Sequence, residues 1–322
     1  DGIGFADLGV HGLKDFTEPQ PLFQVTHPEL PDLFAPLRTL TATETAIPAT
    51  PTRLTGRDAQ VDDLVHALRD DARLVTLTGP GGIGKSRLAI EVAQRSVPWF
   101  RDGVWFVPAV TATTAPAMVS LVHRTLGLSS QAHDPFDVLV AHLAARSALL
   151  VLDNLEQLGE DVTVIARLLA ECPDLRILAT SRSRLRIRGE RRIEVEPLAT
   201  PTGTDDLDAT PSGQLLAERL AQVGHAPLNA PGTGAAAAIC RLVDGIPLGL
   251  ELAAARADEL SLTEIEAGIA GAIDTLSEGD LDLLPHQRTM RSAIQWSVDL
   301  LDDGHRLALT ALGTYAGDSD AA

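Results

Sequence analysis

Apolar residues in the first two thirds of the chain gather in short runs of strand length. Three such runs occupy residues 73–78, 148–154 and 175–180. The second has five apolar residues without polar alternation, which is typical of a strand buried on both faces of a parallel sheet. Between the runs lie helical patterns, such as the spacing of Leu88, Val92 and Ala93. The pattern predicts an α/β fold with a parallel sheet and helices on both faces.

The pattern changes after residue 200. Residues 200–213 are polar and carry Pro and Gly, and beyond them apolar positions recur at helical spacing. Two stripes are formed by Leu215, Leu216, Leu220 and Val223, and by Ala238, Ile239, Leu242 and Val243. Further helices are expected at residues 250–256 and 289–301. Near the N-terminus, the Thr-, Ala- and Pro-rich residues 41–52 have the composition of a linker.

Composition narrows the classes of protein that fit. The chain has 322 residues, enough for two or three domains, and a net charge of −18, which argues against nucleic-acid binding by this segment. The apolar runs are too short for a membrane helix, and no signal peptide is visible. Cys172 and Cys240 lack metal or disulfide spacing, which indicates buried thiols in a cytoplasmic protein. The chain lacks an initial methionine and is expected to be a segment of a longer protein.

A phosphate-binding motif follows the first run. Residues 79–86 read Gly-Pro-Gly-Gly-Ile-Gly-Lys-Ser, which fits G-x-x-x-x-G-K-[ST] between a strand and a helix. Glycines let backbone N–H groups converge on phosphate oxygens, while Lys85 reaches the β- and γ-phosphates and Ser86 binds Mg²⁺. The only other lysine is Lys14, although the chain has 26 basic residues. A glycine-rich turn that binds nothing is the alternative.

Polar residues also end the second and third runs. Asp153 lies at the carboxyl end of its strand, where open α/β sheets bind ligands, and is expected to hold Mg²⁺. Thr-Ser-Arg at residues 180–182 ends the next strand, and Arg182 is expected to contact the γ-phosphate. The alternatives are a capping aspartate and a solvated arginine.

These motifs, read in order, resemble the NB-ARC ATPases, which are signal-transduction ATPases with numerous domains (STAND), and most closely their bacterial regulators. Residues 54–57 are similar to the family's adenine-contacting entry motif, 152–156 to its Walker B motif and 180–182 to its sensor 1. Residues 245–248 are similar to the family's GLPL motif, whose proline, here Pro247, packs near adenine. The resemblance implies that ATP or ADP and Mg²⁺ bind here. The residues implied to contact the nucleotide are Gly56, Arg57, Gly79, Gly81, Gly82, Ile83, Gly84, Lys85, Ser86, Arg87 and Pro247.

The resemblance implies a nucleotide-operated switch with slow or absent hydrolysis. Lys85, Asp153 and Arg182 would act on the phosphates, with Ser86 and Asp153 holding the metal. Asn154 stands where related ATPases often carry a second acid, and Glu156 is two residues further on. Partners would be the other domains of the same chain, including an effector or helical repeat downstream, and other copies in a nucleotide-dependent homo-oligomer. A constitutive AAA+ motor, with its trans-acting arginine finger, and a scaffold with a vestigial site are the rivals.

The resemblance also implies the domain boundaries. Residues 48–200 would form the P-loop domain, 201–285 a helical domain and 286–322 the start of a winged-helix domain, after a linker at 29–47. Residues 1–28 resemble the C-terminal strands of a class III adenylate/guanylate cyclase domain whose catalytic part would lie upstream; a hairpin of no particular origin is the alternative.

Two further features are expected to be structural. The arginines of residues 182–192 alternate in a way that would place the first four on one face of an extended segment, where solvation or pairing with acidic groups is favoured over polyanion binding. Trp99, Trp105 and Trp296 are expected to lie in the core.

Overall fold

A six-stranded parallel sheet forms the centre of the α/β part. The computed structural model describes residues 4–11, 20–26, 45–50, 52–70, 72–128, 134–271, 290 and 306–307. The sheet order is β3-β5-β6-β7-β4-β8. Its strands are β3 (Thr45–Ala46), β4 (Leu74–Thr78), β5 (Val104–Pro108), β6 (Leu149–Asp153), β7 (Arg176–Ser181) and β8 (Glu190–Glu194). The predicted α/β fold with a parallel sheet is confirmed.

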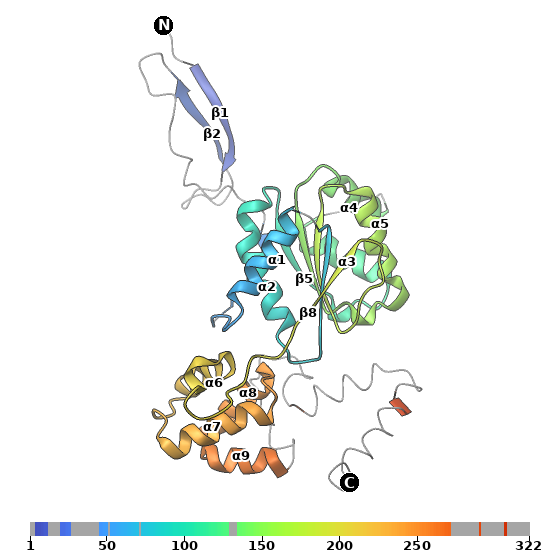
Figure 1. Ribbon diagram of the computed structural model, residues 1–322. Helices are drawn as coiled ribbons and strands as arrows, with labels where there is room; N and C mark the ends of the chain where they lie inside the picture. Colours follow the sequence, from blue (N-terminus) through green and yellow to red (C-terminus); the bar gives the residue numbers. More distant parts are fainter. Residues whose placement is uncertain are drawn as a thin grey trace.

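Helices cover both faces of this sheet (Figure 1). One face packs against α1 (Asp58–Asp70) and α2 (Lys85–Ser96), and the other against α3 (Ala115–Thr125), α4 (Pro135–Leu143) and α5 (Thr163–Glu171). The middle strand β6 serves both cores: Leu149 and Val151 join the first, and Leu150 and Leu152 join the second. Burial on both faces explains why this strand is a continuous apolar run.

The strand order determines where polar strand ends meet. After β4 the chain crosses to β5, on the far side of β7 and β6, whereas β8 lies on the other side of β4. In open α/β sheets, a ligand-binding crevice forms at the carboxyl edge where the connections from the strands leave in opposite directions along the sheet. Register pairs Thr78 of β4 with Ser181 of β7. The phosphate loop, Asp153 and Arg182 therefore emerge at one edge of the sheet.

A helical domain follows the sheet, as predicted (Figure 1). It contains α6 (Pro211–Gln222), α7 (Ala230–Leu242), α8 (Pro247–Ala255) and α9 (Leu262–Gly271). Its core includes Leu215, Leu216 and Ile239, but Val223 and Leu242 of the predicted stripes are 41% and 45% exposed. Val223 is the C-cap of α6 and Leu242 is the last residue of α7, where the chain turns away from the core.

The remaining N-terminal strands form a separate antiparallel pair. Strand β1 (Gly4–His11) pairs with β2 (Gln20–Thr26), with an irregularity between Asp7 and Gly9. The predicted helix at 289–301, Trp296 and the predicted winged-helix segment lie outside the described residues, apart from positions 290 and 306–307. The domain boundaries stay predictions.

Two structural predictions from the sequence are wrong. Trp105 is buried, but Trp99 is 51% exposed, and the Arg69 guanidinium lies 4.8 Å from its ring centroid. A short 3₁₀ turn after α2 holds Trp99 at the surface, where the cation covers one face of the indole. The residues from Arg182 to Arg188 are not a continuous extended stripe, because the chain bends at residues 182–183, turns at residues 188–189, and Arg186 adopts a left-handed conformation with φ of 61°. The predicted free, buried thiols at Cys172 and Cys240 are confirmed.

A glycine joins the helical domain to the segment that leaves the sheet. Gly245 has φ of 63°, and its carbonyl accepts a 3.0 Å hydrogen bond from Leu198 N. An added Cβ there would overlap the Leu198 carbonyl. Gly224 has a similar φ of 77° with open space around it.

We expect Gly245→Ala to lower the free energy of unfolding by about 3 kcal/mol, because it adds a backbone clash to left-handed strain. Gly224→Ala, which adds only the strain, should cost about 1 kcal/mol. Urea denaturation followed by circular dichroism measures both. Equal losses in the two variants would contradict the clash.

Candidate functional site

The loop from Gly79 to Ser86 joins β4 to α2 at the carboxyl edge of the sheet. Gly82 and Gly84 have φ of 75° and 95°, a region that non-glycine residues rarely adopt. Gly84 is the N-cap of α2, so the free N–H groups of the first helical turn lie beside the loop. This geometry is an anion site of the kind that helix N-termini provide.

Lys85 is folded over the loop. Its ammonium donates to the carbonyls of Gly79 at 2.8 Å and Pro80 at 2.9 Å, and the residue is 8% exposed. Burial lowers the pKa of Lys85 to about 8, against the opposing effect of the Glu156 and Asp153 carboxylates. A buried cation that donates its hydrogen bonds to two neutral carbonyls is well placed to exchange them for phosphate oxygens.

Asp153 sits at the end of β6 beneath the loop and accepts two hydroxyl hydrogen bonds. Ser86 Oγ donates to its Oδ1 at 2.7 Å, and Thr180 Oγ1 donates to the same oxygen at 2.6 Å. Asp153 is 6% exposed, and burial raises its pKa although these hydrogen bonds oppose the shift. The structure thus brings Ser86 and Asp153 together, as predicted. It also brings Thr180 to Asp153, because strands β6 and β7 pair side by side.

The oxygens of Ser86 and Asp153 fit a magnesium ion. Mg²⁺ takes one or two protein carboxylates or hydroxyls and completes its shell with phosphate and water oxygens. Across the described residues, no cluster of three or more His, Cys, Asp or Glu side chains is arranged to hold a metal ion. An ion here would therefore need oxygens from a bound phosphate.

Arg182 follows β7 and forms an ion pair with Glu156, which lies just beyond β6. Arg182 Nε lies 3.4 Å from Glu156 Oε1, and the two side chains are 14% and 6% exposed. Burial lowers the pKa of Arg182, whereas its contact with Glu156 acts in the opposite direction. Arg182 is therefore not the solvated arginine of the alternative interpretation. The sequence analysis placed Arg182 at the phosphates and Glu156 in the Walker B motif, but it did not predict that the two side chains pair.

Helix α8 of the helical domain lies directly on the loop. Leu248 N donates to Gly82 O at 3.2 Å, and a Cβ on Gly82 would lie 2.8 Å from that of Leu248. A Cβ on Gly84 would lie 3.9 Å from Pro247 Cγ. The loop glycines therefore also permit close approach of a second domain. Pro247 was predicted, whereas Leu248 was missed although it ends the same Gly-Ile-Pro-Leu motif.

A polar contact holds the two domains together beside the loop. Arg87 donates to the Thr52 carbonyl at 2.6 Å and to its hydroxyl at 2.8 Å. Arg219 of α6 donates to the same hydroxyl at 3.3 Å and pairs with Glu251 of α8 at 3.1 Å. Arg87 is thus engaged with the entry segment rather than with the loop.

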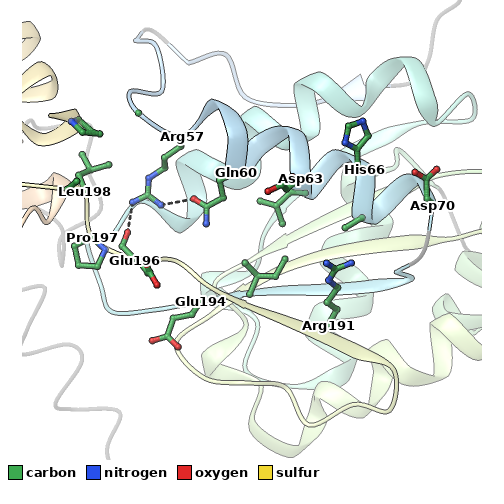
Figure 2. A pocket seen from close by; sticks show the side chains of 16 residues that line it. Arg57, Gln60, Asp63, His66, Asp70, Arg191, Glu194, Glu196, Pro197 and Leu198 are labelled. Atoms are coloured by element: carbon green, nitrogen blue, oxygen red, sulfur yellow. Dashed lines mark hydrogen bonds between the residues drawn. The ribbon is translucent and has the colours of Figure 1, made fainter. Parts of the chain in front are cut away.

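Arg57 lines an open groove between α1 and β8, with a volume of about 840 Å³ (Figure 2). Its buried guanidinium donates to Ile83 O at 2.9 Å and to Glu196 O at 3.0 Å, and one nitrogen lies 3.4 Å from Gln60 Oε1. Gly56 also lines the groove, but the phosphate loop does not. Arg57 therefore contacts both the groove and, through Ile83 O, the phosphate loop. The other lining residues were not predicted; among them are Gln60, Glu196, Pro197, Leu198 and Pro211.

Two mycobacterial proteins are similar to this chain over most of its length. The uncharacterized protein Rv0894 of Mycobacterium tuberculosis is 35% identical over 272 residues, which cover 84% of this chain and 67% of that protein. Rv0890c of the same organism, whose name marks it as a candidate HTH-type transcriptional regulator, is 35% identical over 261 residues, 80% of this chain and 28% of that protein. No model of a known protein family matches the chain.

Solved structures resemble it more remotely. The Drosophila ORC bound to DNA gives a TM-score of 0.48 at 15% identity, over 72% of this chain and 70% of that one. The STAND protein PH0952 of Pyrococcus horikoshii, which has a tetratricopeptide repeat sensor, gives 0.40 at 13% identity, over 80% of this chain and 34% of that one. Among the described helices, none has the length and apolar character needed to cross a membrane.

Proposed function

The chain belongs to the family of the mycobacterial protein Rv0894, and we propose that it is an ATP- and ADP-binding switch module of a larger regulator. One observation carries the proposal: α8 of the helical domain closes on the phosphate loop through Leu248 N and Gly82 O, 3.2 Å apart. A ligand at this loop would touch both domains. It can then favour one arrangement of the domains, provided that it binds the two arrangements with different free energies.

Each polar residue of the loop has a role in this proposal. Lys85 leaves the two loop carbonyls to bind phosphate oxygens, and Arg182 leaves Glu156 for the γ-phosphate. Ser86 and Asp153 would hold Mg²⁺, which supplies positive charge that neutralises the phosphates. The groove beside Gly56 and Arg57 would take the adenosine, since its volume of about 840 Å³ is in the range of ligand pockets.

The closed arrangement corresponds to the ADP-bound state in this proposal. A γ-phosphate would draw Arg182 toward the loop and weaken the contact made by Pro247 and Leu248. The NB-ARC resemblance of residues 245–248 supports this, as does the direct placement of α8 on the loop glycines. A constitutive motor would not need a resting contact that covers its own phosphate site.

The wider protein is also part of the proposal. The chain spans 28% of Rv0890c, whose name supports a place inside a transcriptional regulator. A cyclase-like domain would precede the module. The antiparallel pairing of β1 with β2 is consistent with the C-terminal strands of such a domain. Opening of the two domains would let other copies assemble, as the resemblance implies. Hydrolysis would be slow, because Asn154 replaces an acid.

Denaturing release and chromatography of the nucleotide that copurifies with the chain tests the proposal. We expect close to one ADP per chain. An empty site, combined with no binding of added ADP or ATP, would overturn the proposal. Rapid multiple turnover from an empty site would favour the motor instead.

Nucleotide binding should also take up a proton. With a pKa of about 8, Lys85 is mostly neutral at pH 9 in the nucleotide-free chain, and phosphate oxygens restore its charge. Below pH 8 the Lys85 ammonium of the nucleotide-free chain is already mostly protonated, so ADP affinity should change little there. Between pH 8 and pH 9 the free ammonium loses its proton, and ADP affinity should fall about fivefold. Calorimetry at pH 9 in two buffers with different ionisation heats should give nearly one proton taken up. No uptake at pH 9 would show that Lys85 does not meet the phosphates.

A further inference from the structure

The residues that lead into α1 are fixed at both ends to the α/β part of the chain, the sheet domain. We call residues 52–57 the entry segment. Arg87 of α2 donates to the carbonyl of Thr52 at 2.6 Å and to its hydroxyl at 2.8 Å. At the other end of the segment, Arg57 donates to Ile83 O of the phosphate loop at 2.9 Å. The entry segment is therefore held as part of the sheet domain.

Two hydroxyls of the entry segment contact α6 of the helical domain. Arg219 donates to Thr52 Oγ1 at 3.3 Å, and Thr55 Oγ1 donates to Glu218 Oε2 at 3.2 Å. In each contact one group is charged and the other is a neutral hydroxyl. A hydrogen bond of this kind stabilises more than one between two neutral groups. These two hydrogen bonds, which we call the hydroxyl clasp, join the two domains.

Close packing continues the same interface beyond the clasp. Gly56 has φ of 72°, and an added Cβ there would overlap Pro211, which lies in the first turn of α6. From Pro211 to Arg219 the helix advances by about two turns. The entry segment thus follows α6 over most of its length, and α6 cannot leave the segment without breaking the clasp.

The charged groups of the clasp have partners within their own domain. Arg219 pairs with Glu218 at 3.1 Å and with Glu251 of α8 at 3.1 Å, and its side chain is 12% exposed. Separation of the domains breaks its contact with a neutral hydroxyl but leaves the arginine with these carboxylates. Separation of a buried interdomain ion pair would instead leave a charge without its counter-ion on each side. The clasp is therefore a contact that can open and close reversibly.

The clasp is connected to the contact that covers the phosphate loop. The pair of Arg219 and Glu251 joins α6 to α8, and both helices share the core of the helical domain. Helix α8 donates from Leu248 N to Gly82 O of the loop at 3.2 Å. Movement of α6 away from the entry segment would therefore carry α8 away from the loop.

We propose that the hydroxyl clasp sets how often the helical domain separates from the phosphate loop, and hence how fast a nucleotide leaves it. Thr52 and Thr55 act as positioning residues, through Arg219 and Glu218. The clasp uses only groups of this chain, whereas its effect on nucleotide release rests on the proposed function. Separate measurements test the clasp and its effect on release.

Thr52→Val and Thr55→Val remove the two hydroxyls and keep the β-branched shape of the side chain. Thr113→Val is the matched control, at an exposed position in the loop before α3. All three substitutions remove a threonine hydroxyl, but those of Thr52 and Thr55 meet a charged group of the helical domain. A difference from the control therefore reports the clasp.

Hydrogen exchange without nucleotide tests the clasp. We expect the Leu248 amide to exchange about tenfold faster in each clasp variant, the factor for loss of one hydrogen bond to a charged group. The Ile177 amide, which donates to Arg73 O within the sheet domain, should exchange at an unchanged rate. Unchanged Leu248 exchange in either variant would overturn the proposal. Equal acceleration of both amides would overturn it as well, because the threonines would then stabilise the whole fold.

Release of labelled ADP into an excess of unlabelled ADP measures the consequence. We expect ADP to dissociate about tenfold faster from Thr52→Val and Thr55→Val, and at the unsubstituted rate from Thr113→Val. Unchanged dissociation combined with faster Leu248 exchange would overturn the control of release by the clasp. If the unsubstituted chain binds no ADP, the proposed function fails and the effect on release fails with it, whereas Leu248 exchange still tests the clasp.

Discussion

Lys85→Ala is expected to weaken binding of ADP and ATP by at least about 100-fold. Lys85 is the one lysine among the residues that the structure describes, its ammonium lies at the phosphate loop, and the residue is 8% exposed. Truncating one partner of a buried, hydrogen-bonded charge pair costs about 2–5 kcal/mol, and 100-fold in affinity corresponds to about 2.8 kcal/mol. Fluorescence titration with a labelled ADP measures the loss.

The fold of the nucleotide-free chain should survive this substitution. Within the described part of the chain, the hydrogen bonds of the Lys85 ammonium go to the loop carbonyls of Gly79 and Pro80, which can turn to water. Arg101→Ala is the matched control, because it removes a cation whose side chain is 82% exposed near the end of α2. The control should bind ADP normally. Equal binding by Lys85→Ala and the control would remove the main support for the phosphate site.

Asp153→Asn is expected to change stability and binding in opposite directions. Burial raises the pKa of Asp153, so its charge at pH 7 is a cost to the fold. Asparagine keeps an oxygen for the hydroxyls of Ser86 and Thr180, which donate to Oδ1. The free energy of unfolding of the nucleotide-free chain should therefore increase by about 1 kcal/mol.

Binding that depends on Mg²⁺ should decrease in the same variant. A neutral amide is a poorer ligand for a hard cation than a carboxylate, so the gain in ATP affinity on adding Mg²⁺ should fall at least tenfold. Thermal unfolding without nucleotide and ATP titrations with and without Mg²⁺ give the two quantities. Asp174→Asn, at an exposed turn before β7, is the control. A destabilised Asp153→Asn with normal Mg²⁺ dependence would make Asp153 a structural residue.

The sequence was sufficient for the parts of the fold that are encoded locally. Continuous apolar runs predicted β4, β6 and β7, and the glycine pattern located the loop at the start of α2. The edge strand β8 was missed because its sequence is Glu-Arg-Arg-Ile-Glu, and it is a strand only because it pairs with β4. Strand β5 was missed as well, although Val-Trp-Phe-Val is apolar.

The contacts that the sequence did not predict are long-range ones. Arg57 donates to carbonyls 26 and 139 residues away, so its role requires the folded chain. Thr180 reaches Asp153 through the pairing of β6 with β7. The direction of Glu156 depends on the left-handed conformation of Asn154, which many asparagines do not adopt. Local patterns named the residues of the phosphate loop and, around it, Asp153, Arg182 and Pro247, but they did not predict the long-range contacts that these groups make.

Hydrogen exchange at the start of α8 tests the switch most directly. Leu248 lies in the first turn of α8, where amides have no partner within the helix, so its protection depends on Gly82 O at 3.2 Å in the other domain. We predict that the Leu248 amide is protected with ADP bound and exchanges at least about tenfold faster with a non-hydrolysable ATP analogue. Equal protection with the two nucleotides, both shown to be bound, would contradict a nucleotide-operated switch.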